Sequence, residues 1–354
     1  MIGLASGVRA SRVEAIIAGA RDARALRLEL LDELRRTVPF TWWAWVLTDP
    51  RTAVGCAPLA DVPCLPELPA LIRLKYQTTV NRWTHQATRV ARLTDVGDPR
   101  RSLVWREMQS RFGVVDVASV VFRDRYGTWS FLDLWRDATA GAFRQADVDC
   151  LGELTEPVTA AIRRCLAATF TEPLEARPPL GGPVVLLLGP DLTVRAQTPE
   201  TDRYLRLLVP PEGARSPVPA GAYNVAAQLL ARQAGVDDGP AWARVHVARR
   251  GWLTLSAARI GEERTDGHTH VDDDIAVTIE NCAPLDRADL FSRVHGLTPR
   301  ESQVLTRLAA GDDTRAAARA LSVSEYTVQD HLKAIFSKTT AHDRRSLLAA
   351  ALGP

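Results

Sequence analysis

Three side chains that can pair with the edges of DNA bases fall on one face of an expected helix near the C-terminus. At about 100° per residue, Gln329, Asp330 and Lys333 share one side of the helix that follows Ser324. In the major groove, an amide suits adenine, a carboxylate suits the amino group of cytosine, and an ammonium suits guanine. The pattern therefore indicates a helix that lies in the groove and contacts bases.

The other side of the same helix is aliphatic and needs partner helices. Val328, Leu332 and Ile335 share that side, and Phe336 flanks them. Start and stop signals place two partners directly upstream. Their capping and terminating residues are Thr298, Pro299, Glu301, Gly311 and Asp313. Three helices joined by short turns are therefore expected, with Ser324 capping the third.

The stretch from Leu297 to Arg345 resembles the LuxR-type helix-turn-helix. The family pattern is L-T-x-R-E, a glycine ten residues on, and a helix bearing S-x-x-T-V-x-x-H. The matching residues are Leu297, Thr298, Arg300, Glu301, Gly311, Ser324, Thr327, Val328, His331, Ile335 and Lys338. Two departures bear on stability: Ala316-Ala317 replaces a usual Glu-Ile pair, and Thr340 stands near a usual glycine. The alternative is a helical bundle that binds no nucleic acid.

The resemblance implies that the partner is double-stranded promoter DNA. Side chains expected to contact or orient phosphates are Ser324, Tyr326, Thr327 and His331. Ser337 and Lys338, farther along the polar face, are also expected to bind DNA. Gln329, Asp330 and Lys333 are expected at base edges. For Asp330 the alternative is an ion pair with Lys333, three residues on.

A fourth helix is expected over residues 343–352. In LuxR-type domains this helix pairs two subunits, and Leu347, Leu348 and Leu352 suit that role. The resemblance therefore implies a homodimer, and a contact with RNA polymerase is one further partner that it suggests.

Composition limits the remaining possibilities. The chain has 354 residues, enough for two or three domains, and a net charge of +2 that by itself predicts no nucleic-acid binding. Its lysines are Lys75, Lys333 and Lys338, so phosphate contact should be local to the C-terminal segment. No apolar run approaches the roughly 18 residues of a membrane span, and the N-terminus does not resemble a signal peptide. A cytoplasmic protein without membrane contact is expected.

Residues 1–170 form the first expected domain. The pattern predicts a long helix over 11–36, a strand at 42–48, a proline-rich loop, helices at 68–89 and 102–112, strands at 114–122 and 128–135, and a helix at 146–168. This order fits an antiparallel sheet with helices on its faces and resembles a GAF domain, which implies a sensor or dimerisation module. Seven of the nine tryptophans lie here, and an aromatic core is favoured over a ligand pocket.

Residues 183–283 form the second expected domain, after a linker rich in proline and glycine. Strands are predicted at 184–188, 193–197, 243–249, 252–259 and 275–280, with a helix at 222–233. The order resembles a PAS domain, which binds a small molecule or pairs with another copy. No cysteine or histidine pattern identifies a haem or flavin site, so no cofactor is expected.

Two sets of potential metal ligands, one clustered and one scattered, are interpreted without a metal. His268, His270 and Asp272 to Asp274 are interpreted as a solvated loop between strands. Cys56, Cys64, Cys150, Cys165 and Cys282 are scattered and contain no C-x-x-C, so neither disulfides nor a zinc site is expected.

The predicted fold class is α+β multidomain. Two antiparallel-sheet sensor domains precede residues 284–354, which hold a linker helix and the all-α four-helix DNA-binding domain. No phosphate-binding loop, receiver-type acidic pair, G-x-S-x-G elbow or H-E-x-x-H motif is found, so no enzyme and no catalytic residue is expected. The function indicated is a one-component transcription regulator with an effector that the sequence does not name. The alternatives are a sigma-factor-like polymerase partner and a signalling protein whose C-terminal helices only dimerise.

Overall fold

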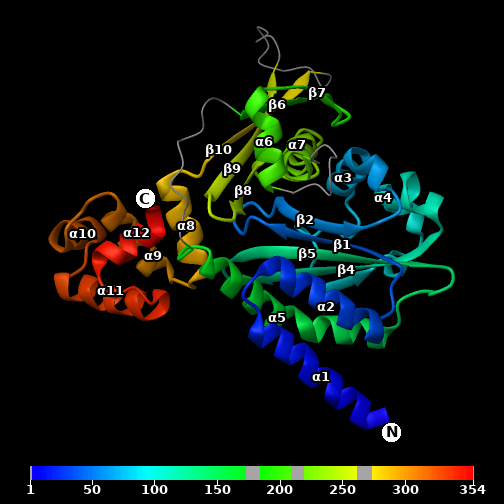
Figure 1. Cartoon of the computed structure of the whole chain (residues 1–354), viewed down its shortest axis with the longest axis horizontal. Helices are drawn as coiled ribbons and strands as arrows, with labels where there is room; N and C mark the ends of the chain where they lie inside the picture. The colour runs from blue at the N-terminus through cyan, green and yellow to red at the C-terminus, as the bar shows by residue number, and fades with distance from the viewer. Residues whose placement is uncertain (1, 173–183, 209–218, 261–272, 354) are drawn as a thin grey trace.

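The computed structural model describes residues 2–172, 184–208, 219–260 and 273–353. Within these ranges, two five-stranded antiparallel sheets are followed by a group of helices that lies to one side of them (Figure 1). The predicted α+β multidomain class is confirmed. His268, His270 and Asp272 lie outside the described residues.

The first sheet is built from residues between 42 and 137. Its strands are β1 (Trp42–Thr48), β2 (Gly55–Asp61), β3 (Val90–Arg92), β4 (Val114–Asp124) and β5 (Gly127–Asp137), in the order β2-β1-β5-β4-β3. Its helices are α1 (Ile2–Gly19), α2 (Ala23–Thr37), α3 (Leu68–Gln77), α4 (Leu103–Glu107) and α5 (Gln145–Ala168), with short 3₁₀ turns at Leu65–Glu67, Thr94–Val96, Pro99–Arg101 and Gln109–Phe112. α2 and α5 cover one face, and α3 and α4 cover the other.

The second sheet repeats this arrangement. Its strands are β6 (Val184–Leu188), β7 (Val194–Gln197), β8 (Trp242–Val247), β9 (Gly251–Ile260) and β10 (Asp274–Asn281), in the order β7-β6-β10-β9-β8. Numbered from its own first strand, it has the same strand order as the first sheet. Its helices are α6 (Pro199–Leu208) and α7 (Ala220–Gln233). α7 packs on β9 and also on α3 and β2, so it joins the two sheets.

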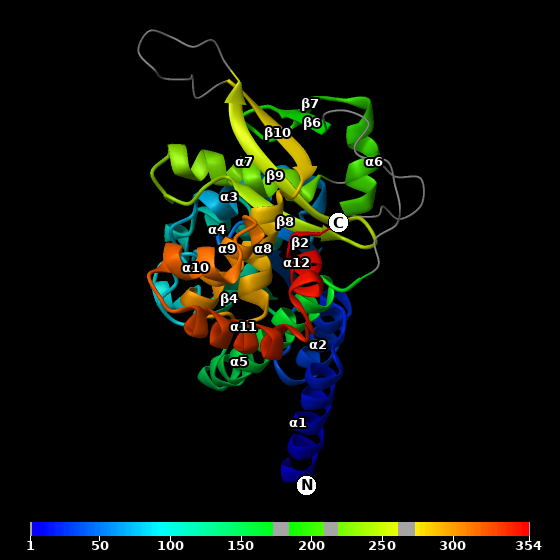
Figure 2. The same ribbon diagram turned by 90° about the vertical axis from the view of Figure 1, so that its left-hand side faces the viewer.

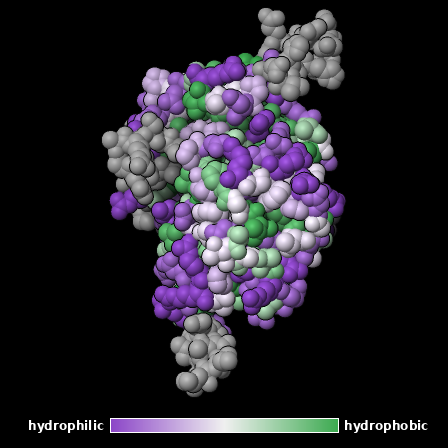
Figure 3. Space-filling view, turned by 90° about the vertical axis from the view of Figure 1, so that its right-hand side faces the viewer, coloured by the Kyte–Doolittle hydropathy of each residue, from purple (hydrophilic) through white to green (hydrophobic). Residues whose placement is uncertain are grey.

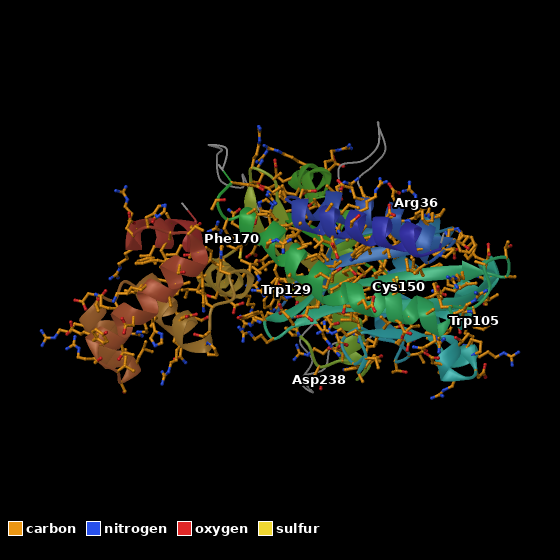
Figure 4. The ribbon with its side chains drawn as sticks, turned by 90° about the horizontal axis from the view of Figure 1, so that it is seen from below. Arg36, Trp105, Trp129, Cys150, Phe170 and Asp238 are labelled. Atoms are coloured by element: carbon orange, nitrogen blue, oxygen red, sulfur yellow. The ribbon has the colours of Figure 1, made fainter. Side chains whose placement is uncertain are left out.

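The helices at the C-terminal end follow directly. They are α8 (Pro284–Val294), α9 (Pro299–Ala309), α10 (Thr314–Leu321), α11 (Glu325–Thr339) and α12 (Arg344–Leu352). One hydrophobic core runs from the α5 face of the first sheet through Phe170 and Phe291 into α9, α11 and α12. Figure 4 shows Phe170 at the end of α5, beside this helical group.

A buried arginine connects the first sheet, the second sheet and the C-terminal helices. Arg244, on β8, donates from Nε to Asp49 Oδ2 at 2.6 Å and from Nη2 to Asp49 Oδ1 at 3.0 Å. Asp49 belongs to the β1–β2 turn, and neither side chain is exposed. Arg244 Nη1 also lies 3.1 Å from Asp289 Oδ2 on α8. A bidentate guanidinium–carboxylate pair is directional, so it fixes the orientation of these elements.

Several predicted elements near the N-terminus differ from the structure. The helix expected over residues 11–36 is two helices, because Asp22 leaves the helix and caps α2 by accepting from Ala25 N at 2.7 Å. The proline-rich loop contains β2, where Pro58 is tolerated because β2 is an edge strand. The helix expected over 68–89 ends at Gln77.

That early end has a long-range cause. Arg82 is fully buried and lies 3.0 Å from Asp237 Oδ2 and 3.0 Å from Gln228 Oε1, both beyond the first sheet. The chain after α3 must therefore extend toward the second sheet. The helix expected over 102–112 is also interrupted, at Met108, and β3 was not predicted.

The tryptophans mostly serve as core residues, as the favoured interpretation held. Trp45, Trp83 and Trp129 are at most 1% exposed, and each indole N–H has a hydrogen-bond acceptor. All five cysteines are free. In the described part of the chain, no helix is long and apolar enough to cross a membrane, and no cluster of ligand side chains suits a metal ion.

Candidate nucleic-acid interface

Local capping defines where α11 begins. Ser324 has extended backbone and its Oγ accepts from Thr327 N at 3.0 Å, which satisfies one of the free N–H groups of the first turn. Thr327 Oγ1 lies 2.8 Å from the same hydroxyl. The two hydroxyls expected at phosphates thus hold each other at the start of the helix, beside its positive dipole end.

The two sides of α11 separate as the sequence predicts. Val328 and Ile335 are fully buried and Leu332 nearly so, in the core shared with α9 and α10. The exposed polar side chains are Glu325, Tyr326, Gln329, Asp330, Lys333, Ser337 and Lys338, while His331 is half-buried. Figure 2 views the molecule from this side, with α10 and α11 in front of the sheets. The polar face of α11 is therefore available to a partner.

The tight turn between α10 and α11 is supported by the preceding helices. Asp313 caps α10 by accepting from Ala316 N at 2.7 Å. Ala317 and Ala318 are buried, and their small side chains let α10 approach its neighbours closely. Ser322 ends α10 with φ of 55°, in the left-handed region.

Asp330 and Lys333 form an ion pair within α11, which is the alternative to base contact that the sequence offers for Asp330. Lys333 Nζ lies 3.1 Å from Asp330 Oδ1, and the same ammonium lies 5.9 Å from the Tyr326 ring centroid. The side chains of Lys333 and Asp330 are 72% and 47% exposed. An exposed pair of this kind contributes only about 0.3–0.5 kcal/mol, so DNA can replace it at little cost.

Lys338 occupies a different position from the other polar residues. Its Nζ lies 2.6 and 2.8 Å from the two carboxylate oxygens of Glu301, which is only 5% exposed. Glu301 also accepts from Thr298 N at 2.7 Å, completing the predicted capping box of α9. Burial acts to raise the pKa of Glu301, but the bonds from Lys338 and Thr298 outweigh it and lower the pKa. Lys338 therefore links the end of α11 to the start of α9.

Charge is concentrated in this segment. Residues 295–351 contain 8 of the 44 basic and 6 of the 42 acidic residues, which leaves 36 of each in the rest of the chain. The net +2 of the protein thus resides here. Arg315 and Arg319 are exposed on α10 and form no ion pair within the described residues. Sequence reasoning did not single them out, although counting charge by segment would have done so.

α12 faces inward as well as outward. Leu347 and Ala351 are fully buried in the same chain, and Arg287 on α8 donates from Nη1 to the carbonyl oxygen of Ala350. Leu348 and Leu352 are partly exposed. Of the three leucines expected at a subunit interface, Leu347 is thus used within the chain.

The helical group is fastened to the hairpin of β4 and β5. Tyr126 Oη donates to Gly296 O at 2.9 Å, and Arg293 Nη1 donates to Tyr126 O at 2.7 Å. Arg163 lies 2.9 Å from Asp124 and donates to the carbonyls of Arg293 and Val294 at 3.2 and 3.3 Å. A cation at the end of α8 satisfies free carbonyl groups and complements the helix dipole.

Comparison with known families agrees with this geometry. Residues 295–351 match the family described as bacterial regulatory proteins, luxR family. The chain matches no curated protein. The segment from α9 to α12 is a LuxR-family helix-turn-helix domain, a match that supports DNA binding by this part of the chain.

Proposed function

We propose that the protein is a one-component bacterial transcription regulator. It binds promoter DNA as a homodimer through α11, and the two sheets upstream receive the signal. The observation that carries the proposal is the exposed face of Gln329, Asp330 and Lys333 on a capped helix within the luxR-family match. Such a regulator acts where bacterial DNA is, in the cytoplasm.

The contacts are assigned by chemistry and position. Gln329 suits adenine, Asp330 a cytosine amino group and Lys333 guanine. Ser324, Tyr326 and Thr327 lie at the start of α11 and His331 lies near its middle. Their hydroxyl and ring N–H groups can approach phosphates. Arg315 and Arg319 on α10 join them, because the first helix of a helix-turn-helix crosses the DNA backbone.

Modest charge explains why we expect a dimer. Few cations face DNA, and each neutralised phosphate contributes to affinity through counterion release. A single domain would therefore bind weakly at physiological salt, whereas two linked domains gain from effective concentration. The GAF-like and PAS-like assignments of residues 1–170 and 183–283 remain predictions, as do these boundaries; a repeated strand order is consistent with two related sensor domains.

The junction at Tyr126 is the route by which the sheets would influence DNA binding. Four hydrogen bonds join the β4–β5 hairpin and α5 to the region of Arg293 to Gly296, immediately before α9. A signal that shifts β5 would move this hairpin and with it the orientation of the helical domain.

Selection of genomic fragments by the purified full-length protein tests the proposal. We expect recurrent enrichment of a short sequence with two-fold symmetry, because a symmetric dimer presents two copies of α11. Enrichment of no fragment, with and without cell extract, would favour the signalling protein that only dimerises. Co-purification with RNA polymerase, together with DNA binding that requires it, would favour the sigma-factor-like alternative.

A further inference from the structure

A cavity of about 220 Å³ lies on the face of the first sheet that carries α3 and α4. Its walls are largely apolar and include Val46, Leu71, Ile72, Val104, Phe131 and Trp135. Ala220 and Asn224 at the start of α7 form part of one wall, so the second sheet's helix contributes to the cavity. Figure 3 shows the surface on the side away from the C-terminal helices, where apolar residues (green) near the centre lie among hydrophilic ones.

The charges in the cavity wall cancel. Lys75 Nζ lies 2.7 Å from Asp133 Oδ2, and the two side chains are only 13% and 7% exposed. Ser119 Oγ donates to the other carboxylate oxygen at 2.7 Å. Among the described residues, these are the charged side chains that line the cavity. An anionic or cationic occupant would therefore lose its hydration without gaining a free counter-charge.

Two aromatic residues of the wall carry polar groups. Trp135 is 2% exposed, and its Nε1, which has no hydrogen-bond partner within the described residues, is itself fully buried and so is packed against its neighbours rather than open to the cavity. Tyr76 Oη accepts from Gly55 N at 2.9 Å, which leaves its own hydrogen to donate.

We propose that this cavity binds a small, uncharged, mainly apolar molecule. A cavity of about 150 Å³ holds benzene, so this one suits roughly nine to twelve non-hydrogen atoms. Nucleotides are too large for it, and smaller phosphates would find no unpaired cation among the described residues that line the cavity. This inference rests on the proposed function as a regulator, because the molecule in the cavity would be the effector of that regulator.

Binding would bear on how the two sheets pack. The cavity is bounded by β1, β2 and β5 of the first sheet and by α7 of the second. Phe131, Asp133 and Trp135 lie on β5, the strand that begins at the hairpin holding Tyr126. An occupant therefore touches both the interface between the sheets and the strand that leads to the helical domain.

The test uses calorimetric titration of the full-length protein with acetophenone and 1-indanone, two neutral aromatic ketones, and with benzoate, an anion of similar size. We expect saturable binding of at least one ketone, one per chain, and at least tenfold weaker binding of benzoate. Ala60→Leu, which fills the cavity, should weaken ketone binding at least tenfold.

A charge variant makes the test directional. Asp133→Asn leaves Lys75 without a counter-ion and should make benzoate bind at least tenfold more tightly than it binds the unaltered protein. Asp61→Asn, at an exposed position of β2, is the matched control and should leave all affinities unchanged. Circular dichroism establishes that each variant is folded. Binding of neither ketone, a preference of the unaltered protein for benzoate, or no effect of Ala60→Leu would overturn the proposal. DNA is absent from these titrations, so their failure leaves the proposed DNA recognition untouched.

Discussion

Replacing Lys338 separates a structural role of this lysine from a role in DNA binding. In Lys338→Met the aliphatic stem remains but the ammonium that contacts both Glu301 oxygens is lost. Glu301 would keep the N–H of Thr298 as a donor. Breaking a fully buried ion pair by removing one partner costs about 3–5 kcal/mol. The Lys338 side chain is 35% exposed, and water therefore reduces the expected loss to about 1–2 kcal/mol.

Native-state hydrogen exchange of the full chain measures this loss where it occurs. Amides of α9 and α11 should exchange about 5- to 30-fold faster in Lys338→Met, the equivalent of 1–2 kcal/mol in opening free energy. Lys333→Met is the matched control, because its exposed pair with Asp330 contributes only a few tenths of a kcal/mol.

DNA binding distinguishes the two roles of Lys338. Removing a lysine that contacts a phosphate reduces the slope of log affinity against log salt by about one unit. We expect an unchanged slope of log affinity against log salt for Lys338→Met. Unchanged hydrogen exchange together with a slope reduced by one would refute the structural role and return Lys338 to the phosphate contacts.

Four further predictions concern bases, backbone and pH. Lys333→Ala should weaken binding to a selected site by about 1–3 kcal/mol and relax preference at one base pair; uniform weakening on all sequences would make it a phosphate contact. Asp330→Asn should change base preference, and merely tighter binding to all DNA would exclude base recognition. Thr340→Gly should raise the opening free energy of α11 by about 1 kcal/mol and so slow its amide exchange, because Thr340 has a left-handed φ of 55° that glycine adopts without strain. Faster exchange would contradict this. Burial lowers the pKa of His246 and His295 to about 4, below the value of about 6.5 in the unfolded chain. The free energy of unfolding should therefore fall as the pH drops from about 6.5 toward 4. The loss at pH 5 should be at most about 2 kcal/mol per histidine. A melting temperature that is constant over pH 5–7 would contradict the burial of both rings.

The helical domain could be predicted because its signals are local. The capping box of Thr298 and Glu301, the N-caps Asp313 and Ser324, and the aliphatic side of α11 each depend on residues within one or two turns. These signals placed the start of every helix from α9 to α11. The left-handed Thr340 likewise explains why a glycine is usual there.

Features that depend on distant residues could not be predicted in this way. α3 ends early because the buried Arg82 pairs with Asp237, which lies more than 150 residues farther along the chain. Lys338 turns to Glu301, 37 residues upstream, rather than to the polar face of α11. The docking of α7 on α3 and β2, which adds Ala220 and Asn224 to the cavity wall, also has no local sequence signal.

Recognition of bases by α11 is the central claim, and one comparison tests it most directly. Fluorescence anisotropy would measure binding of a selected site and of a scrambled site by the unaltered protein, by Gln329→Ala and by Gln303→Ala. Gln303 is an exposed glutamine on α9 and serves as the control. We predict that Gln329→Ala loses about 1–3 kcal/mol on the selected site alone, while Gln303→Ala binds normally. Equal affinity of the unaltered protein for both DNAs would contradict the account.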